Sequence, residues 1–420
     1  MRAGFGMGEI VFPQDMFPLE GFLGVHDNPH ARVMLFDGGK DKMALVAVEL
    51  VNCPEREIDF CKTEIEKQAG IPRDQVWVHM THAITTPHEP GPMGPPEKRP
   101  PLTEEDLKKR ELFYTAVENA VREALARALD GYTDVKYGWG TGICEANTNR
   151  DIETPYGWWV GLGGNRPSNK TMSVLTFEDM SGKRIGAFVS YGIKPCAIDN
   201  SGMKEGVRYV SSEVCGMACT KAEEKLGAPV MFVMSAAGDQ IPAKTSFREI
   251  VEDGVAVLAD EGVEQGFTYA EEISDVMRDS IVAISEKTVC DVTETETGWK
   301  TLSFSWERRK GGRRSPKKEL VNEPDGTTAE LTAELFRLGD AVFLAERPEV
   351  NAQTEAELLE QSPFEHTILM SMVDGGMKYL PDRWSFEHAT WEAQSSMLMP
   401  GAAEKLVEEA VKKMKEFQEE

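Results

Sequence analysis

A long apolar run and a second, shorter one, separated by a segment with the features of a helix, constrain the fold of this chain more than any other feature. The runs are KMALVAVELV (42–51) and DQVWVHM (74–80), and the first has the continuous apolar character of a strand covered on both faces. Residues 54–70 lie between them, with Pro54 near the start and Gly70 past the end, the positions these residue types favour in helices. The order strand, helix, strand predicts an α/β fold.

The rest of the chain continues in this manner and then becomes richer in strands. A helix is predicted to begin near Thr103, with Asp106 completing a capping-box pattern, and to end before Gly131. Further helices are predicted at 211–227, over an acidic stretch at 243–290, and at 402–417, and further strands are predicted at 170–179, 183–193, 229–242, 299–309, 340–349 and 366–376. With no internal repeat and no long linker, the simplest architecture is one α/β domain over residues 1–420, in which mixed β-sheets are covered by helices and 243–290 is a helical acidic insertion.

Charge and cysteine usage limit the partners and the compartment that we expect. The net charge of −25 over 420 residues disfavours nucleic acid and anionic membranes, and the basic segment RRKGGRRSPKK (308–318) is interpreted as a solvated turn. No membrane-length apolar run and no signal peptide is evident, and the seven cysteines lack paired spacing. These features predict a cytoplasmic protein with reduced thiols and a small-molecule substrate, and they leave a homo-oligomer possible.

Polar residues follow the predicted strands at the points where the strands end. Open α/β sheets bind ligands at such strand ends, so we expect these side chains to converge on one pocket. Three of the seven histidines also lie within residues 79–88. Spacing alone does not name the reaction. The strand-end residues are His82, Arg150, Lys194, Asp239, Glu349 and Tyr379.

Seven motifs, in order along residues 4–412, resemble the neutral/alkaline ceramidase family. The motifs are GVHDNPHARVMLF, THAITTPHEPG, NTNRD, GAFVSYGIKP, SSEVCGMA, MSAAGDQIP and YLPDRWSFEHATWEAQSS. The resemblance implies a catalytic domain of α/β type that holds zinc at its strand tips and hydrolyses the amide of ceramide. Larger members add an immunoglobulin-like C-terminal domain, for which we expect no room here.

The resemblance implies only part of the family's zinc site. His82, Glu349 and Tyr379 match three metal-ligand positions, and Arg150 matches a retained arginine. A histidine ligand of the family is replaced by Lys194. Two further positions lie beside the substrate in the family. Ile84 stands here where the family has a histidine, and Ile241 stands where it has a serine.

Lys194 leaves two mechanisms open at this point. Three surviving ligands are enough for zinc or another divalent metal with an open position for water, and Cys196, His79 or His88 are nearby substitutes for the missing one. Alternatively, the Lys194 ammonium takes the metal's place and stabilises an oxyanion or enolate, or forms a Schiff base.

These considerations predict a hydrolase of a small amide, lactone or ester, assisted by a divalent metal, which is not a true ceramidase. The alternatives are a metal-independent lyase or isomerase that uses Lys194, and a non-catalytic assembly or binding protein. The predicted metal ligands are His82, Glu349 and Tyr379; the predicted catalytic residues are Lys194, Arg150, Asp239 and Tyr379. The glycine-rich stretch 154–167, with Trp158 and Trp159, is interpreted either as packing in a core or interface or as a lid over the substrate.

Overall fold

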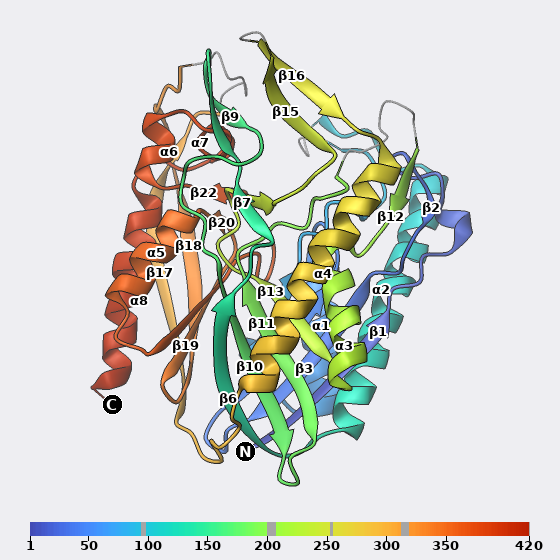
Figure 1. Cartoon of the computed structure of the whole chain (residues 1–420), viewed down its shortest axis with the longest axis vertical. Helices are drawn as coiled ribbons and strands as arrows, with labels where there is room; N and C mark the ends of the chain where they lie inside the picture. The colour runs from blue at the N-terminus through green and yellow to red at the C-terminus, as the bar shows by residue number, and fades with distance from the viewer. Residues whose placement is uncertain (94–97, 200–206, 253–254, 312–318, 420) are drawn as a thin grey trace.

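A computed structural model shows four layers, helices on sheet on sheet on helices (Figure 1). The structure describes residues 1–93, 98–199, 207–252, 255–311 and 319–419. About a third of the chain is helix and about a third is strand, so the predicted fold class, mixed β-sheets covered by helices, is confirmed.

The larger sheet has eight strands and is mixed. Its β4–β5 and β11–β13 pairs are parallel, whereas the other neighbours are antiparallel. The predicted strand–helix–strand unit at the start of the chain therefore forms as expected, with its two strands adjacent. In spatial order the strands are β13 (Val230–Met234), β11 (Arg184–Tyr191), β10 (Thr171–Asp179), β6 (Thr133–Ile143), β1 (Arg2–Glu9), β3 (His30–Asp37), β4 (Lys42–Val48) and β5 (Val76–Met80).

A four-stranded sheet packs against the larger one, and five short strand pairs lie around them. The four strands, in spatial order, are β17 (Thr297–Arg309), β18 (Pro324–Leu338), β19 (Ala341–Glu346) and β21 (His366–Met370). The short pairs are β2 (Phe22–Val25) with β12 (Arg208–Val210), β7 (Asn147–Asn149) with β14 (Gln240–Pro242), β8 (Asp151–Thr154) with β9 (Gly157–Val160), β15 (Phe247–Glu252) with β16 (Val255–Asp260), and β20 (Glu349–Val350) with β22 (Tyr379–Leu380).

Helices cover both outer faces of this pair of sheets. Helix α2 has the predicted capping box, in which Thr103 and Asp106 exchange side-chain and backbone hydrogen bonds. Helix α1 ends at Gly70, whose φ of 64° is the left-handed conformation that glycine adopts readily. The helices are α1 (Glu55–Ala69), α2 (Glu104–Asp130), α3 (Glu213–Leu226), α4 (Val263–Lys287), α5 (Ala352–Gln361), α6 (Arg383–Glu387), α7 (Trp391–Ser395) and α8 (Ala402–Gln418), with 3-10 turns at Gln14–Met16 and Arg73–Gln75.

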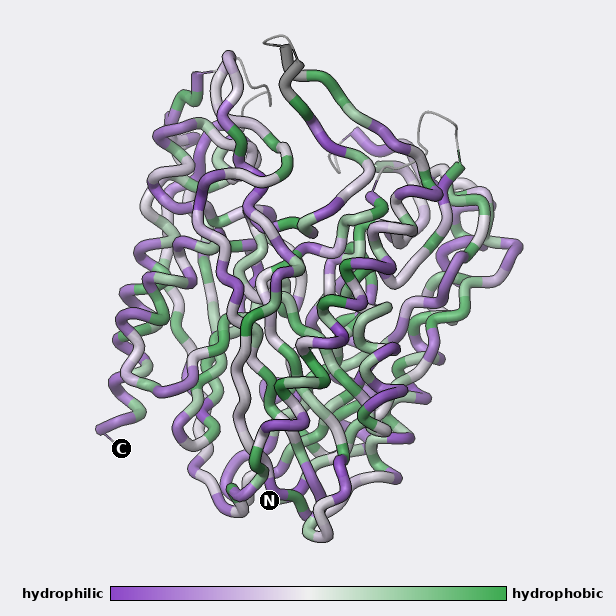
Figure 2. Tube along the Cα trace, in the orientation of Figure 1, coloured by the Kyte–Doolittle hydropathy of each residue, from purple (hydrophilic) through white to green (hydrophobic). Residues whose placement is uncertain are grey.

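Three hydrophobic cores hold the layers together. The first lies between the larger sheet and helices α1 to α4, the second between the two sheets, and the third between the smaller sheet and helices α5 and α8. In Figure 2 the hydrophobic colour gathers along the strands in the middle of the molecule. Because both faces of the larger sheet are covered, its strands carry the continuous apolar runs seen in the sequence.

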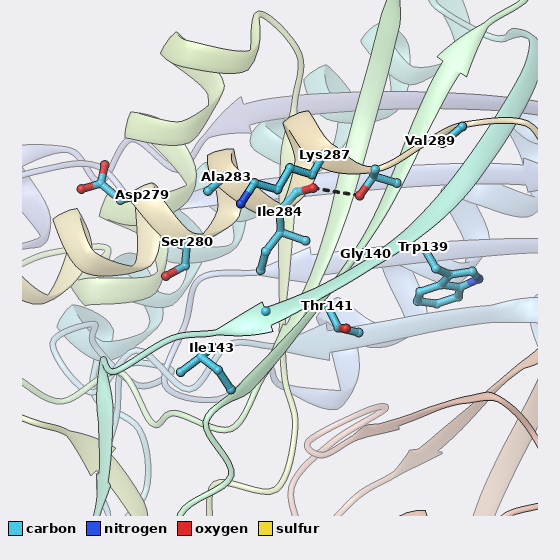
Figure 3. Close-up of a pocket in the computed structure, with 12 residues that line it drawn as sticks. Trp139, Gly140, Thr141, Ile143, Asp279, Ser280, Ala283, Ile284, Lys287 and Val289 are labelled. Carbon is cyan, nitrogen blue, oxygen red and sulfur yellow. Dashed lines mark hydrogen bonds between the residues drawn. The ribbon is translucent and has the colours of Figure 1, made fainter.

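Strand β6 approaches helix α4 so closely that glycine is required along one of its faces. A Cβ on Gly138 would lie 2.0 Å from the carbonyl oxygen of Val289, and one on Gly140 would lie 2.7 Å from Ile284. Figure 3 shows Ile284 projecting from α4 beside this strand, at a groove of about 710 Å³. Asp279 and Lys287 are the charged residues that line this groove.

The acidic segment 243–290 differs from the predicted continuous helix. Helix α4 occupies its second part, but residues 247–260 form the antiparallel hairpin β15–β16, with Glu249 opposite Leu258. The strands pair with Ile250 opposite Val257, and both are β-branched residues of the kind that favours strands. The predicted basic turn lies largely outside the described residues, at 312–318.

All seven cysteines are buried and unpaired, as their spacing predicts. Cys215 and Cys219, four residues apart in α3, both pack in the first core. Across the described ranges, no helix combines the length and the apolar character needed to cross a membrane.

A buried carboxyl in α1 gives a prediction about stability. The Glu57 side chain is fully buried, neither oxygen has a hydrogen-bond partner among the described residues, and burial raises its pKa to about 8. An unfolded-state glutamate ionises near 4.5, so native Glu57 costs stability as pH rises from there to about 8. We expect Glu57→Gln to stabilise the protein by about 1–3 kcal/mol at pH 8 and by much less at pH 5, as measured by denaturant unfolding. Glu55→Gln, at an exposed position two residues earlier, is the control, and an equal gain at both pH values would contradict this account.

Candidate active site

The ends of strands from both sheets and their connecting loops surround one cavity of about 310 Å³. Four of the six predicted site residues line it, namely His82, Arg150, Lys194 and Tyr379. In Figure 1 the short strands β7, β20 and β22, which flank or carry some of these residues, lie above the central strands, and the hairpins β8–β9 and β15–β16 project beyond them.

The short parallel pair β20–β22 places Glu349 directly opposite Tyr379. Lys194, in the loop after β11, extends its side chain to both residues. Its Nζ lies 2.5 Å from Glu349 Oε2 and donates a hydrogen bond of 2.8 Å to the Tyr379 hydroxyl. Lys194 is 3 % exposed and Glu349 is 4 % exposed, so this ion pair is almost wholly shielded from water.

Burial and the ion pair have opposite effects on the protonation of Lys194. Burial disfavours its charged form, but the carboxylate of Glu349 outweighs burial, and the pKa of Lys194 lies above its ordinary value. For Glu349, burial is likewise outweighed by the ammonium of Lys194, which lowers the pKa of the carboxyl. The pair is therefore an ammonium and a carboxylate, and the lysine is not the free amine that a Schiff base requires.

His82 presents one ring nitrogen to this pair. Its backbone has a φ of 61°, which is uncommon for a residue with a Cβ, and its Nδ1 lies 2.5 Å from the carbonyl oxygen of Val51. A carbonyl only accepts, so Nδ1 carries the hydrogen and Nε2 has the free lone pair of the neutral ring. Nε2 is 3.6 Å from Glu349 Oε1. Burial lowers the pKa of His82, and Glu349 only partly offsets this effect, so the ring is neutral and basic at Nε2.

Arg150, between β7 and β8, is held by a residue whose role the sequence did not indicate. Its Nε donates to Glu392 Oε1 at 2.7 Å, and its Nη2 also contacts this oxygen. The guanidinium lies 5.4 Å from the centre of the Tyr379 ring. Glu392 is fully buried in α7, within the quoted motif WEAQSS, but nothing in that motif indicates an arginine partner 242 residues away.

Asp239 lies behind the cavity and is not among the described residues that line it. Its carboxylate accepts hydrogen bonds from the Asn149 side chain at 2.8 Å and from the backbone N–H of Ala352, the first residue of α5, at 2.9 Å. Burial raises its pKa to about 6. These contacts let Asp239 hold the loops that carry Arg150 and Glu349, whereas its predicted catalytic role stays a prediction.

The nearby donors considered as replacement ligands are engaged elsewhere or are protonated. The His79 ring lies between the Ser371 carbonyl and the Met234 N–H, at 3.0 and 3.1 Å. His88 pairs with Glu20 at 3.0 Å. Cys196 lines the cavity, but burial raises the pKa of its thiol well above the ordinary value.

The three predicted metal ligands lie together but do not fit a divalent cation in this arrangement. The Lys194 ammonium pairs with the Glu349 carboxylate and donates a hydrogen bond to the Tyr379 hydroxyl. It would strongly repel a metal cation bound to the same oxygens. Among the described residues, no group of three or more His, Cys, Asp and Glu side chains is arranged to hold a metal ion. No reaction step is therefore derived from a metal, and the predicted zinc stays a prediction.

The cavity also has apolar lining residues, beside the charged Asp199, Arg248 and Glu249, and sequence reasoning found only part of this apolar set. Trp159 and Trp391 pack edge to face at 5.3 Å, and both line the cavity, whereas the predicted lid stays a prediction. Trp158, by contrast, packs on Trp384 and His388. The remaining large apolar lining residues come from a loop, from β9 and β14, and from the unpredicted pair β15–β16, and they are Ile84, Val160, Ile241, Phe247 and Leu258.

The two packed sheets, their outer helices and a strand-tip cavity define an α/β protein with a ceramidase-like fold. The chain is similar to the crystal structure of neutral ceramidase from Pseudomonas aeruginosa, with 15 % identity and a TM-score of 0.70 over 99 % of this chain and 74 % of that one. It is also similar to a ceramidase complexed with C2, with 14 % identity and a TM-score of 0.69 over 99 % and 75 % of the two chains. No protein-family model and no curated protein sequence matches it. At these identities the similarity shows the fold, and the fold that the sequence motifs imply is confirmed.

Proposed function

We propose that this protein is a hydrolase of a small amide, lactone or ester, and that Lys194 supplies the positive charge at its reaction centre. The observation that carries the proposal is the buried Lys194 ammonium, 2.5 Å from Glu349 and 2.8 Å from the Tyr379 hydroxyl, at a cavity that His82 also lines. The ceramidase-like fold supports hydrolysis as the class of reaction.

The groups present account for both proton transfer and charge stabilisation. His82 Nε2 takes a proton from a water molecule, whose oxygen attacks the carbonyl carbon of the substrate. The negative charge that develops on the carbonyl oxygen is stabilised by the Lys194 ammonium and the Tyr379 hydroxyl. When the tetrahedral intermediate collapses, His82 returns its proton to the departing nitrogen or oxygen. Glu349 and Arg150 hold Lys194 and Tyr379 in place.

Measuring metal content together with activity tests this proposal. We expect purified protein to contain well below one zinc per chain by elemental analysis, and to hydrolyse members of a panel of short amides, lactones and esters at the same rate after chelator treatment. Stoichiometric zinc, lost together with activity in His82→Ala, would instead establish the metal-assisted hydrolase that the family resemblance implies. In that case Lys194→Met should tighten the metal, because it removes a competing positive charge.

Ceramide is expected to be a poor substrate. Ile84 and Ile241 line the cavity at positions that carry polar groups in the family, and an alkyl side chain neither donates nor accepts a proton. Fatty-acid release from ceramide should therefore be much slower than hydrolysis of the best small substrate, measured with the same preparation. Efficient ceramide hydrolysis would overturn this prediction.

A lyase or isomerase using the same residues is the second candidate. His82 Nε2 would remove a proton beside a carbonyl, and Lys194 would stabilise the resulting enolate. The same ammonium supports this candidate as well as hydrolysis. Incorporation of oxygen from ¹⁸O-labelled water into the product distinguishes hydrolysis, which requires it at the new carboxyl, from isomerisation.

A further inference from the structure

The apolar half of the cavity is built from three separate parts of the chain. Trp159 comes from β9, Phe247 from β15, and Trp391 from the start of α7. Trp159 is 7 % exposed and meets Trp391 edge to face at an angle of 80°. Together with Tyr379, these three residues make four aromatic side chains that line one small cavity, and its aliphatic lining residues are Ile84, Val160, Ile241 and Leu258.

Two of these rings have contacts that relate them to neighbouring parts of the site. Burial raises the pKa of the Glu249 carboxyl in β15, and the nearby indole of Trp159 in β9 partly offsets this effect. Trp391 is followed directly by Glu392, which binds Arg150 beside the Tyr379 ring. The aromatic wall is therefore connected to the polar residues through one short helix, and a compound in the cavity contacts both.

The size of the cavity limits what it holds. Its volume of about 310 Å³ is roughly twice that of an engineered cavity of about 150 Å³ that binds one benzene molecule. One ring-sized group and one reacting carbonyl group therefore fit within it.

We infer that the substrate carries an aromatic ring, which binds against Trp159, Phe247 and Trp391 while its amide or ester carbonyl meets Lys194 and Tyr379. This inference deepens the proposed hydrolase and rests on it for the identity of the reacting bond. A ring that packs edge-on or offset against protein aromatic rings gains about two- to twelvefold in affinity beyond the burial of its surface. An aliphatic group of similar size lacks that gain.

Binding measured in the His82→Gln variant, in which the proposed hydrolysis is slowed, tests the inference. The probes are phenylacetamide, cyclohexylacetamide and propionamide, titrated calorimetrically into the full chain that carries this substitution. We expect phenylacetamide to bind at least about fivefold more tightly than cyclohexylacetamide, and propionamide to bind most weakly. Equal affinities for the aromatic and the alicyclic amide, or no binding of either, would overturn the inference.

Two neighbouring tryptophans provide a matched pair of variants. Trp159→Ala should remove most of the preference for phenylacetamide, whereas Trp158→Ala should retain it, because Trp158 packs on Trp384 outside the cavity lining. Trp159→Phe keeps a ring at the site and should retain most of the preference even if Trp159→Ala melts at too low a temperature to titrate. Loss of the preference in Trp158→Ala, or its persistence in Trp159→Ala, would contradict an aromatic subsite at this wall.

The two proposals fail in different ways. Selective binding of phenylacetamide without hydrolysis of any aromatic amide or ester would end the hydrolase proposal and leave the aromatic site in place. Hydrolysis of aliphatic substrates with no preference for a ring would support the hydrolase and end the inference about its substrate.

Discussion

Lys194→Met lowers kcat for a small amide or ester by about 10²–10³, the usual effect of removing a group aimed at developing negative charge. The side chains have similar length and apolar stems, so the substitution removes the charge and little volume. Lys194 Nζ lies within 2.8 Å of both Glu349 and Tyr379. In the variant, neither of these two residues has the ammonium as a neighbour. Turnover per folded molecule, from initial rates and the folded fraction by circular dichroism, is the measurement.

A second variant separates catalysis from stability in this experiment. Lys194→Met leaves the carboxylate of Glu349 buried without its partner, and breaking a buried ion pair in this way costs about 3–5 kcal/mol. The double variant Lys194→Met, Glu349→Gln removes both charges and should regain much of that stability without regaining activity. If activity returns with stability, Lys194 has a structural role only.

His82→Gln is expected to lower kcat by about 10²–10⁴, the range that a positioned general base contributes. Glutamine retains hydrogen-bonding capacity toward the Val51 carbonyl but has no group that takes up a proton near neutral pH. The loss should appear in kcat more than in KM, because the base acts on water rather than on the bound substrate.

His88→Gln is the matched control for the histidine prediction. His88 belongs to the same loop but pairs with Glu20 and does not line the cavity among the described residues. The His88→Gln variant should therefore retain near-normal kcat. Full activity in His82→Gln, or equal losses in both variants, would exclude His82 as the base.

The apolar strands and most helices follow from local sequence. The runs in β4 and β5 are buried on both sides, and the capping box at Thr103 satisfies backbone groups within four residues. Their structure depends on neighbours a few positions away, which periodicity and turn residues describe well. The pair β15–β16 differs from the prediction because its acidic residues indicate an exposed helix, whereas its β-branched Ile250 and Val257 lie opposite each other on two strands.

The polar strand ends were also evident from the sequence, because each follows an apolar run directly. The different environments of these polar residues were not evident from the sequence. Asp239 and His82 both follow strands, yet the Asp239 carboxylate holds two loops, whereas the His82 imidazole lines the cavity. Which strand-end side chain reaches a cavity depends on backbone angles, such as the φ of 61° at His82, that composition does not specify.

The sequence by itself thus determined the α/β class, the main strand–helix order and the set of polar residues at the strand ends. The tertiary structure decided what those residues do to one another. Only packing of two sheets brings Lys194 within 2.5 Å of Glu349, and only the position of α7 gives Arg150 its buried partner Glu392. The protonation of Lys194 depends on both burial and this distance, and neither exists before the chain folds, so tertiary contacts decide whether its position holds a metal ligand or an ammonium.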